Sequence, residues 1–188
     1  MPYRNVAFRA GEYYHLYNRG NNFQSIFFDR ENYLYFLRQV REHLATEVIE
    51  IVAYCLMPNH YHLLVQLKTD DLSAAMQPFA LSYTKAINKR YTRVGSLFQG
   101  RFKATRVDRD DYLLHLSRYI HLNPVTAGLV QRLQDWEFSS YPEFIGQRNG
   151  SLPKPGIVPS QFPSPDAYRQ FVESCVEDDK GIEHLLFD

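Results

Sequence analysis

Seven stretches of the chain carry the hydrophobic spacing of regular secondary structure. Four are short, β-branched or aromatic, and bounded by turn residues, which predicts strands at about 12–19, 48–56, 61–67 and 102–107. Helical spacing follows the capping residue Asp29, covers about 72–91, and follows the capping carboxylates of 108–111 toward Asn123-Pro124. The order β-α-β-β-α-β-α predicts an α+β fold, a ferredoxin-like antiparallel sheet with packed helices.

The character of the chain changes after Trp136. Residues 150–165 contain five prolines, which is typical of a linker or an extended strap. A short amphipathic helix at 168–176 and an acidic end, Glu177-Asp178-Asp179, follow. We therefore expect a main domain at 1–134 and a Pro-rich, acidic C-terminal extension at 135–188.

The net charge of zero hides an uneven distribution along the chain. Residues 1–134 hold 17 basic and 11 acidic side chains, whereas 135–188 hold 4 basic and 10 acidic ones. Residues 85–106 contain seven basic side chains and no acidic one. A segment of this kind favours an anionic partner such as nucleic acid. The acidic tail is either a solvated end or a segment that folds over the basic face as a mimic of DNA.

Composition excludes several other classes. With 45% apolar and 22% charged residues the chain can bury a core and is not a disordered one. Cys55 and Cys175 form no C-x-x-C pair, which argues against a disulfide scaffold or a cysteine zinc site. No apolar stretch approaches the roughly 20 residues of a membrane span, and no secretory signal is visible, so we expect a cytoplasmic protein.

The pair His60 and His62 is the strongest chemical feature. Side chains on a strand alternate between its faces, so both imidazoles should lie on one face, with Tyr61 and Leu63 on the opposite, packed face. Two adjacent imidazoles can hold a divalent metal ion. The pattern alone also fits two histidines on a half-exposed strand with no such role.

A second constellation lies on the last predicted helix. His115, Tyr119 and Asn123 recur at a spacing of four residues and form one polar stripe. A phenol can act as a nucleophile, and an amide oxygen can serve as a neutral metal ligand. A tyrosine at this place also fits an amphipathic residue at the edge of the core.

A third constellation lies inside the basic segment, at residues 95–104. Arg101 and Lys103 alternate there with Phe98 and Phe102, which would combine phosphate contacts with stacking on bases. The alternative is a solvated basic loop with two core phenylalanines.

Together and in this order, the three constellations resemble the single-tyrosine HUH transposases, and among them the IS200-like REP-associated tyrosine transposases. The resemblance covers about residues 13–130. It rests on these matching stretches: Tyr14-His15-Leu16-Tyr17-Asn18-Arg19-Gly20, Met57-Pro58-Asn59-His60-Tyr61-His62-Leu63-Leu64-Val65, Gly100-Arg101-Phe102-Lys103-Ala104, and Arg118-Tyr119-Ile120-His121-Leu122-Asn123-Pro124-Val125-Thr126-Ala127-Gly128.

The resemblance implies a metal-dependent transposase that cleaves and rejoins single-stranded DNA through a covalent 5′-phosphotyrosine. Tyr119 would be the nucleophile, because Tyr61 faces away from the metal. His60, His62 and Asn123 would hold Mg²⁺ or Mn²⁺, with His115 and Asn59 beside them. The expected DNA contacts are Arg19, Lys85, Lys89, Arg90, Arg93, Arg101, Lys103, Arg106, Phe98 and Phe102. For Arg19, pairing with a surface carboxylate is an equal alternative.

The partner implied by the resemblance is a single-stranded hairpin formed by palindromic repeats. Relatives are monomers or homodimers, and the sequence leaves both open. One alternative function is a domesticated hairpin-binding protein that no longer cuts DNA. Another is a nickase that starts replication or conjugation, although such enzymes are usually longer.

Overall fold

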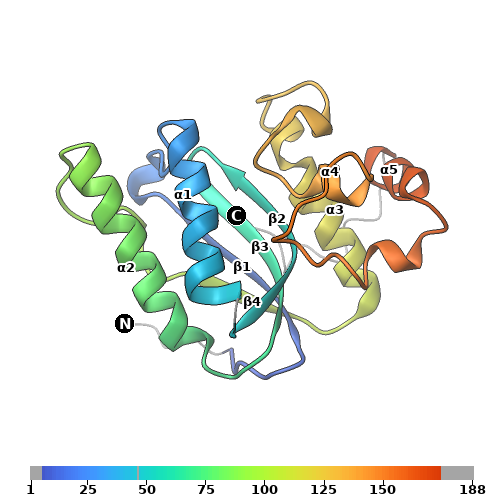
Figure 1. The fold of residues 1–188 in the computed structure, drawn as a ribbon, viewed down its shortest axis with the longest axis horizontal. Helices are drawn as coiled ribbons and strands as arrows, with labels where there is room; N and C mark the ends of the chain where they lie inside the picture. Colours follow the sequence, from blue (N-terminus) through green and yellow to red (C-terminus); the bar gives the residue numbers. More distant parts are fainter. Residues whose placement is uncertain (1–5, 46, 175–188) are drawn as a thin grey trace.

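A four-stranded antiparallel sheet with helices on both faces forms the centre of the molecule (Figure 1). The computed structural model describes residues 6–45 and 47–174. The strands are β1 Tyr13–Arg19, β2 Ile49–Met57, β3 His60–Leu67 and β4 Lys103–Val107, in the order β2-β3-β1-β4. The helices are α1 Arg30–Val40, α2 Leu72–Arg90, α3 Asp110–Thr126, α4 Tyr141–Phe144 and α5 Pro165–Glu173. This order and topology confirm the predicted ferredoxin-like arrangement.

Short elements connect the main ones. Single 3₁₀ turns occupy Asn21–Phe23, Leu133–Asp135 and Pro159–Gln161, and a π-helical turn at Arg41–Ala45 continues α1. None of the helices in the described ranges is long and apolar enough to cross a membrane.

The helix starts follow local capping chemistry, with one correction to the sequence-based expectation. The carboxylate of Asp29 accepts the amide of Asn32 at 3.0 Å and begins α1 as predicted. At α3 the N-cap is Arg109, which makes no side-chain cap. The carboxylate of Asp111 accepts from the Arg109 guanidinium at 3.0 Å, so the expected capping by this carboxylate is wrong. Helix α3 also continues past Pro124 to Thr126.

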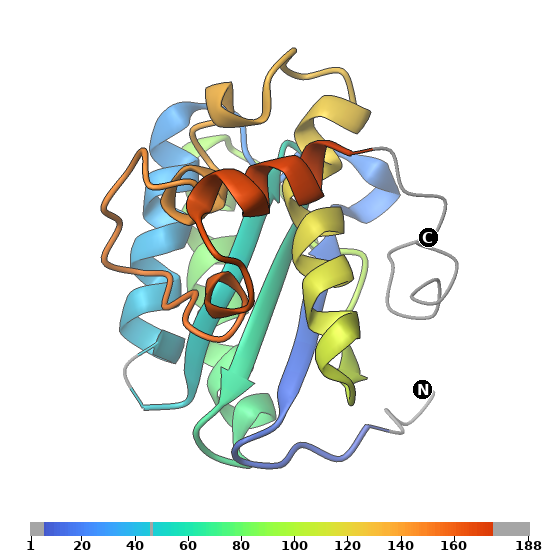
Figure 2. The same ribbon diagram turned by 90° about the vertical axis from the view of Figure 1, so that its right-hand side faces the viewer.

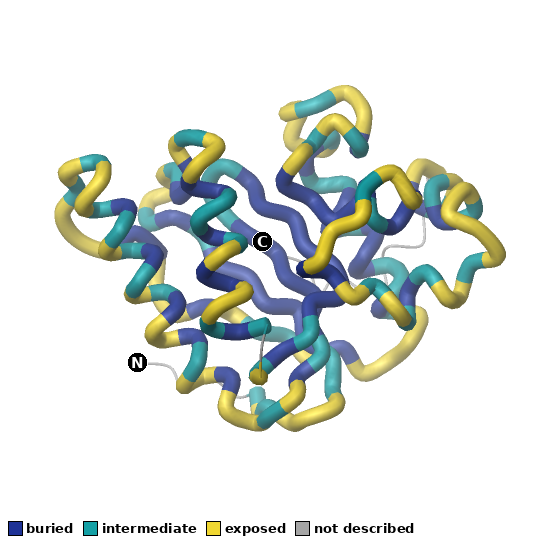
Figure 3. The backbone as a smooth tube through the Cα atoms, in the orientation of Figure 1, coloured by how far each residue is buried: buried dark blue, intermediate teal, exposed yellow. Residues whose placement is uncertain are grey.

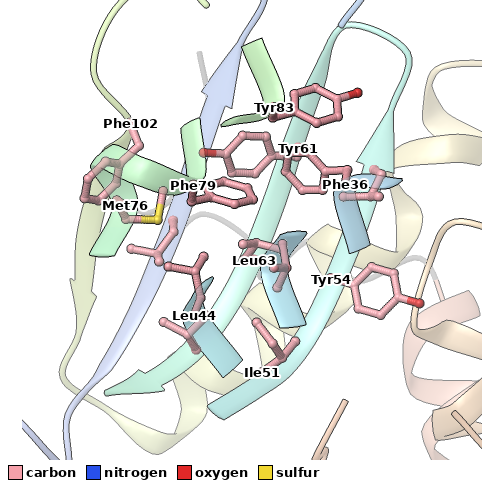
Figure 4. Packing of buried hydrophobic residues seen from close by; sticks show 14 of the residues in the cluster. Phe36, Leu44, Ile51, Tyr54, Tyr61, Leu63, Met76, Phe79, Tyr83 and Phe102 are labelled. Carbon is pink, nitrogen blue, oxygen red and sulfur yellow. The ribbon is translucent and has the colours of Figure 1, made fainter. Parts of the chain in front are cut away.

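The face of the sheet that α1 and α2 cover, called here the α1/α2 face, holds the larger core. Tyr61 and Leu63 of β3 point into it, as predicted, and pack with Phe36 of α1 and Phe79 of α2 (Figure 4). The rings of Phe36 and Tyr61 lie 5.0 Å apart, and those of Phe36 and Phe79 lie 5.1 Å apart. The alternation of strand residues therefore places the apolar half of β3 on this face.

The opposite face, called here the α3 face, lies under α3, with α4 and α5 packed beside this helix (Figure 2). Leu64 of β3 packs there with Leu116 and Ile120 of α3. The sequence pattern suggested a half-exposed strand, but His62 is fully buried on this face. The middle of this side of β3 is therefore interior, whereas His60 at its start is only partly buried.

Residues 136–174 pack onto the rest of the chain. The Pro-rich segment begins as a strap along β2 at Pro153 and then folds into turns, including the 3₁₀ turn Pro159–Gln161. Along β2, Leu56 donates its amide to Phe138 at 2.9 Å, and Lys154 donates its amide to Ile51 at 2.7 Å. The buried sheet and the more exposed surrounding loops can be compared in Figure 3. Helix α5 starts at Pro165, earlier than predicted, because Ser164 caps the amide of Ala167. The acidic residues Glu177, Asp178 and Asp179 lie outside the described residues.

Candidate active site

The two histidines of β3 meet a third one from the neighbouring strand. The rings of His60 and His62 lie 4.9 Å apart. Tyr17 of β1 is paired with His62, and His15 lies two residues before it on the same face. His15 Nε2 and His62 Nδ1 form a buried hydrogen bond of 3.0 Å. This bond fixes the orientation of His62, so Nε2 is the nitrogen that a metal would take.

Helix α3 places Tyr119 and Asn123 over these histidines. The Tyr119 ring stands edge-on to His62, with the ring centroids 5.5 Å apart. Asn123 donates its amide nitrogen to the Tyr119 carbonyl at 2.8 Å, and its side chain is also hydrogen-bonded to His60. The structure thus brings together the four residues that the sequence indicated for nucleophile and metal ligands.

Burial keeps both histidines neutral. It lowers the pKa of His60 to about 4, against the smaller opposing effect of the Asn123 hydrogen bond, and nearby Arg19 lowers this pKa further. Burial, followed by the neighbouring His15 and His60, lowers the pKa of His62 well below its ordinary value. Neutral imidazoles are the form that binds a metal ion.

The turn between β2 and β3 orients His60. Asn59 Oδ1 lies 2.6 Å from His60 Nδ1, and Asn59 Nδ2 donates to the Phe23 carbonyl at 3.2 Å. Gly20 donates its amide to the Asn59 carbonyl at 2.7 Å. A Cβ on Gly20 would lie 1.9 Å from the carbonyl oxygen of Gln24, so only glycine fits beside this turn. The predicted support of His60 by Asn59 thus has a structural basis.

The donor set fits a divalent metal with an incomplete protein shell. The part of the chain that the structure describes holds no group of three or more His, Cys, Asp or Glu side chains placed to bind a metal. A metal here would therefore take His60, His62 and the Asn123 amide oxygen, with its other positions filled by water and phosphate. Two imidazole nitrogens and one amide oxygen leave coordination positions open, unlike the closed four-ligand shell of a structural zinc.

A cationic cleft of about 250 Å³ adjoins the site at the end of β1. It is lined by Asn18, Arg19, Gln99, Gly100, Arg101 and Lys103. Arg19 is paired with His60 across the β1–β3 ladder, and its guanidinium lies 4.1 Å from the centre of the Phe23 ring. Three of the predicted DNA contacts, Arg19, Arg101 and Lys103, therefore gather next to the predicted metal ligands, where cationic side chains can contact a phosphate backbone.

The other predicted DNA contacts lie apart from the cleft, and some are paired. Arg90 lies 2.7 Å from Asp29, and Arg106 lies 2.7 Å from Glu12. Residues 85–106 contain no acidic side chain, but in the folded chain carboxylates from distant segments pair with two of their arginines. The expectation of a segment without compensating carboxylates is therefore wrong. Both arginines are about half exposed, so each pair is worth less than about 1 kcal/mol and can yield to phosphate.

The remaining basic residues of this segment lie on α2 and just after it. Lys85 and Lys89 are exposed on α2, and Arg93 donates to Gln24 at 3.2 Å. They could contact a duplex that extends away from the cleft.

Phe98 and Phe102 belong to the core. They are only 5% and 8% exposed, so the ring stacking on bases expected from the sequence does not fit this conformation. His115 packs edge-on against Phe171 of α5, with the ring centroids 5.7 Å apart. The structure thus gives His115 a packing contact in the extension.

Two histidines of the α3 face, His15 and His121, make buried contacts that the sequence pattern did not indicate. His15 orients His62, and the signal for it was the same two-residue alternation on β1 that identified His60 and His62. His121 is fully buried, with Tyr168 Oη 2.8 Å from Nδ1 and Ser140 Oγ 2.8 Å from Nε2. No local pattern shows these contacts, because both partners lie in the C-terminal extension.

Paired histidines on a strand, covered on the same face of a ferredoxin-like sheet by a helix that carries a tyrosine, form the arrangement of a single-tyrosine transposase. Residues 10–123 match the family described as Transposase IS200 like, and the chain belongs to this family.

Named relatives agree with this assignment. The chain is 32% identical over 103 residues to a Haemophilus influenzae protein named as a REP-associated tyrosine transposase, covering 49% of this chain and 58% of that protein. It is 30% identical over 95 residues to the REP-associated tyrosine transposase of Escherichia coli K12, covering 49% of this chain and 54% of that protein. The matched regions thus span little more than half the length of these relatives.

A solved structure shares the fold. It is a REP-associated tyrosine transposase bound to a REP hairpin, with a TM-score of 0.64 and 19% identity, covering 82% of this chain and 98% of that chain.

Proposed function

We propose that this chain cleaves and rejoins single-stranded DNA beside a hairpin, with Tyr119 as the nucleophile. The observation that carries the proposal is the convergence of Tyr119 with His60, His62 and Asn123 on the α3 face. A protein that only binds DNA has no use for a tyrosine set against two oriented, neutral imidazoles. The hairpin substrate is proposed from the bound REP hairpin of the structural relative.

The chemistry proposed is a transesterification. The Tyr119 oxygen attacks a backbone phosphorus, the bond from phosphorus to the 3′-oxygen breaks, and a 5′-phosphotyrosine forms. The phenol gives up one proton and the leaving 3′-oxygen gains one, so no net hydrolysis occurs. Attack by a second 3′-hydroxyl reverses these steps and rejoins the strand.

The residues of the chain have separate tasks in this scheme. His15 and Asn59 hold the two ligand histidines in orientation, and Asn123 ties the tyrosine helix to His60. A bound Mg²⁺ or Mn²⁺ would polarise the scissile phosphate and offset the charge on the leaving oxygen. The cationic cleft would hold the phosphates on one side of the cleaved bond.

The test is the formation of a covalent protein–DNA adduct. The protein is incubated with Mn²⁺ or Mg²⁺ and a labelled hairpin with single-stranded flanks, and adducts are resolved on a denaturing gel. We expect an adduct with the wild type and a loss of at least about a thousandfold in Tyr119→Phe.

Two tyrosine controls identify the nucleophile. Tyr61→Phe removes the phenol next to the histidines in sequence, which points to the α1/α2 face, and Tyr112→Phe removes another phenol of α3. Both should form the adduct. An adduct that persists in Tyr119→Phe contradicts the assignment. Tight hairpin binding with no adduct in either metal would instead favour a DNA-binding protein without cleavage.

A further inference from the structure

A pocket of about 330 Å³ lies between α1 and the C-terminal extension. Its volume is near the lower end of the range of ordinary ligand sites. Helix α1, the turn that follows it and Tyr54 of β2 form one part of the wall, and residues 143 and 148–153 form the other. The second part lies outside residues 10–123, which match the transposase family. The pocket shares no lining residue with the cationic cleft, so the proposed cleavage gives it no role.

Three arginines and one glutamate form the charged part of the lining, so its formal charge is positive. Arg148 donates to both carboxylate oxygens of Glu143, at 2.8 and 2.7 Å, and neutralises this carboxylate. Arg38 and Arg41 are both exposed, and Arg41 donates to the neutral Ser151 hydroxyl at 3.0 Å. The glutamate of the lining therefore leaves two of its arginines uncompensated, and these can pair with an anion.

Tyr54 places a neutral hydroxyl beside these arginines. Its oxygen lies 3.4 Å from Arg148 Nη2. Burial raises the pKa of Tyr54 well above its ordinary value, against smaller opposing effects of Arg148 and Arg41. In Figure 4 the ring lies at the edge of the core, with its hydroxyl directed away from Tyr61. The phenol therefore keeps its proton, which it can donate to an anion in the pocket.

Much of the remaining lining is apolar. Leu34 and Leu37 of α1 are partly buried, and Leu152 and Pro153 of the extension are buried. Apolar side chains next to arginines can bury the hydrocarbon part of a ligand while its charged end is paired. A DNA phosphate has no such hydrocarbon part. The lining therefore favours an organic anion over the DNA backbone.

We propose that this pocket binds an organic carboxylate with an apolar body, either a free small molecule or the end of a peptide chain. The guanidinium fork matches the two oxygens of a carboxylate. Arg38 and Arg41 would pair with these oxygens, Tyr54 would donate a hydrogen bond, and the apolar body would cover Leu34 and Leu37. The ligand would connect α1 to the extension and so stabilise their packing. This binding does not depend on the cleavage chemistry at Tyr119.

The experiment follows the binding of hexanoate to the full chain by NMR, through the backbone amide signals of residues 34–41 and 148–152. We expect hexanoate to shift signals of both segments until the pocket is saturated. Hexanamide keeps the apolar chain without the charge and should bind at least about tenfold more weakly, because charge-assisted hydrogen bonds are lost. Acetate keeps the charge without most of the apolar chain and should also bind at least about tenfold more weakly.

Arg41→Ala tests the cationic part of the pocket from an exposed position, so the fold should tolerate it. The affinity for hexanoate should fall at least about tenfold, and that for hexanamide should stay unchanged. Arg132→Ala is the matched control, because Arg132 is an exposed arginine outside the lining that pairs with Asp135 at 2.7 Å. This variant should bind hexanoate as the wild type does.

A short leucine-rich peptide with a free or an amidated C-terminus distinguishes the two sources of the carboxylate. A free-ended peptide that binds more tightly than hexanoate, and loses this affinity on amidation, assigns the pocket to a chain end. Tighter binding of hexanoate assigns it to a small molecule.

Three results would overturn the proposal. The first is the absence of saturable shifts in both segments with hexanoate and with the free-ended peptide. The second is inorganic phosphate that binds as tightly as hexanoate, or an affinity for hexanoate that is equal in Arg41→Ala and the wild type. The third is an affinity for hairpin DNA that falls in Arg41→Ala and not in Arg132→Ala, which would assign these arginines to DNA. Each readout is independent of adduct formation, so the carboxylate site and the cleavage proposal can fail separately.

Discussion

Side chains on the α1/α2 face and on the α3 face alternate along the same strands, yet they are buried for different purposes. The α1/α2 face is filled mainly by aromatic and aliphatic groups such as Phe36, Tyr61 and Phe79. The α3 face buries His15, His62 and His121 among its apolar residues. Buried polar groups cost free energy unless they are hydrogen-bonded. The α1/α2 face thus contributes most of the stability. On the α3 face, burying oriented polar groups lowers the net stability.

The contrast shows that side-chain alternation lets one strand contribute to core packing with one set of residues and to the candidate site with the other. Along β3, a change at Leu63 acts on packing, and a change at the neighbouring His62 acts on the site. Substitutions on the two faces should therefore affect different measurements.

Among the changes that compare the two faces, His60→Ala should have the largest effect, which is on adduct formation. It removes a proposed metal ligand and the partner of Asn59 and Asn123, so the adduct should fall by at least about a hundredfold. His115→Ala is the control, since His115 contacts Phe171 and should lose only a few-fold. Denaturing gels of both variants measure this difference, and equal losses would contradict the site as described.

On the other face, Phe79→Ala should act on stability. The side chain is fully buried, and its removal should lower the free energy of unfolding by about 3–5 kcal/mol. Leu129→Ala, at a position that is 40% exposed, should cost less than about 1 kcal/mol. Urea unfolding gives both values. The amount of adduct formed per folded Phe79→Ala molecule should stay close to that of the wild type. A large fall would show that packing on the α1/α2 face also controls the site on the α3 face.

Tyr168→Phe tests the polar network that holds the tyrosine helix. The Tyr168 hydroxyl lies 2.8 Å from His121 Nδ1 and 3.1 Å from Ser117 Oγ, both on α3. Its loss should cost about 1–3 kcal/mol and slow the adduct several-fold, with hairpin affinity unchanged. Tyr141→Phe, which loses one bond to Glu173, is the matched control. A change in hairpin affinity instead of adduct rate would argue against a positioning role for the network.

Per pH unit, the most gradual expected effect is a dependence of stability on pH that arises on the α3 face. Burial lowers the pKa of His121 to about 3 and that of His60 to about 4, whereas both are near 6.5 in the unfolded chain. The unfolded chain therefore binds more protons between about pH 6.5 and 4, and stability falls as the pH is lowered through this window. Each histidine should contribute on the order of 1 kcal/mol per pH unit. Urea unfolding at several pH values measures the slope, which His121→Asn should reduce; a slope equal to the wild type's contradicts this assignment.

Much of the fold could be predicted from local patterns. The seven main elements and their order follow from spacing and turn residues, and the two faces of β3 follow from alternation. Within the site, His60, His62, Tyr119 and Asn123 were indicated by motif and resemblance. All of these patterns are local: they involve residues at most a few positions apart, where helix or strand geometry fixes which side chains share a face.

Local patterns did not predict the contacts between segments that are distant in the sequence. The pairing of Arg106 with Glu12 and the bonds of His121 to Ser140 and Tyr168 depend on how the chain returns on itself. Phe98 and Phe102 show the same limit, because a basic, aromatic loop has one composition whether its rings face solvent or the core. The metal, the nucleophilic role of Tyr119 and the domain boundary at residue 134 stay predictions.

The strap along β2 also determines how the sheet can meet other chains. Backbone groups of β2 bond to residues 138–140 and 154, which cover one edge of the sheet, while the other edge strand, β4, is short and carries Lys103 and Arg106. Covered, short and charged edges resist strand addition between molecules. A protein cut back to the part that matches the family would expose β2 as a long, apolar edge. The extension should therefore protect the protein from aggregation, and a shortened version should precipitate where the longer chain does not.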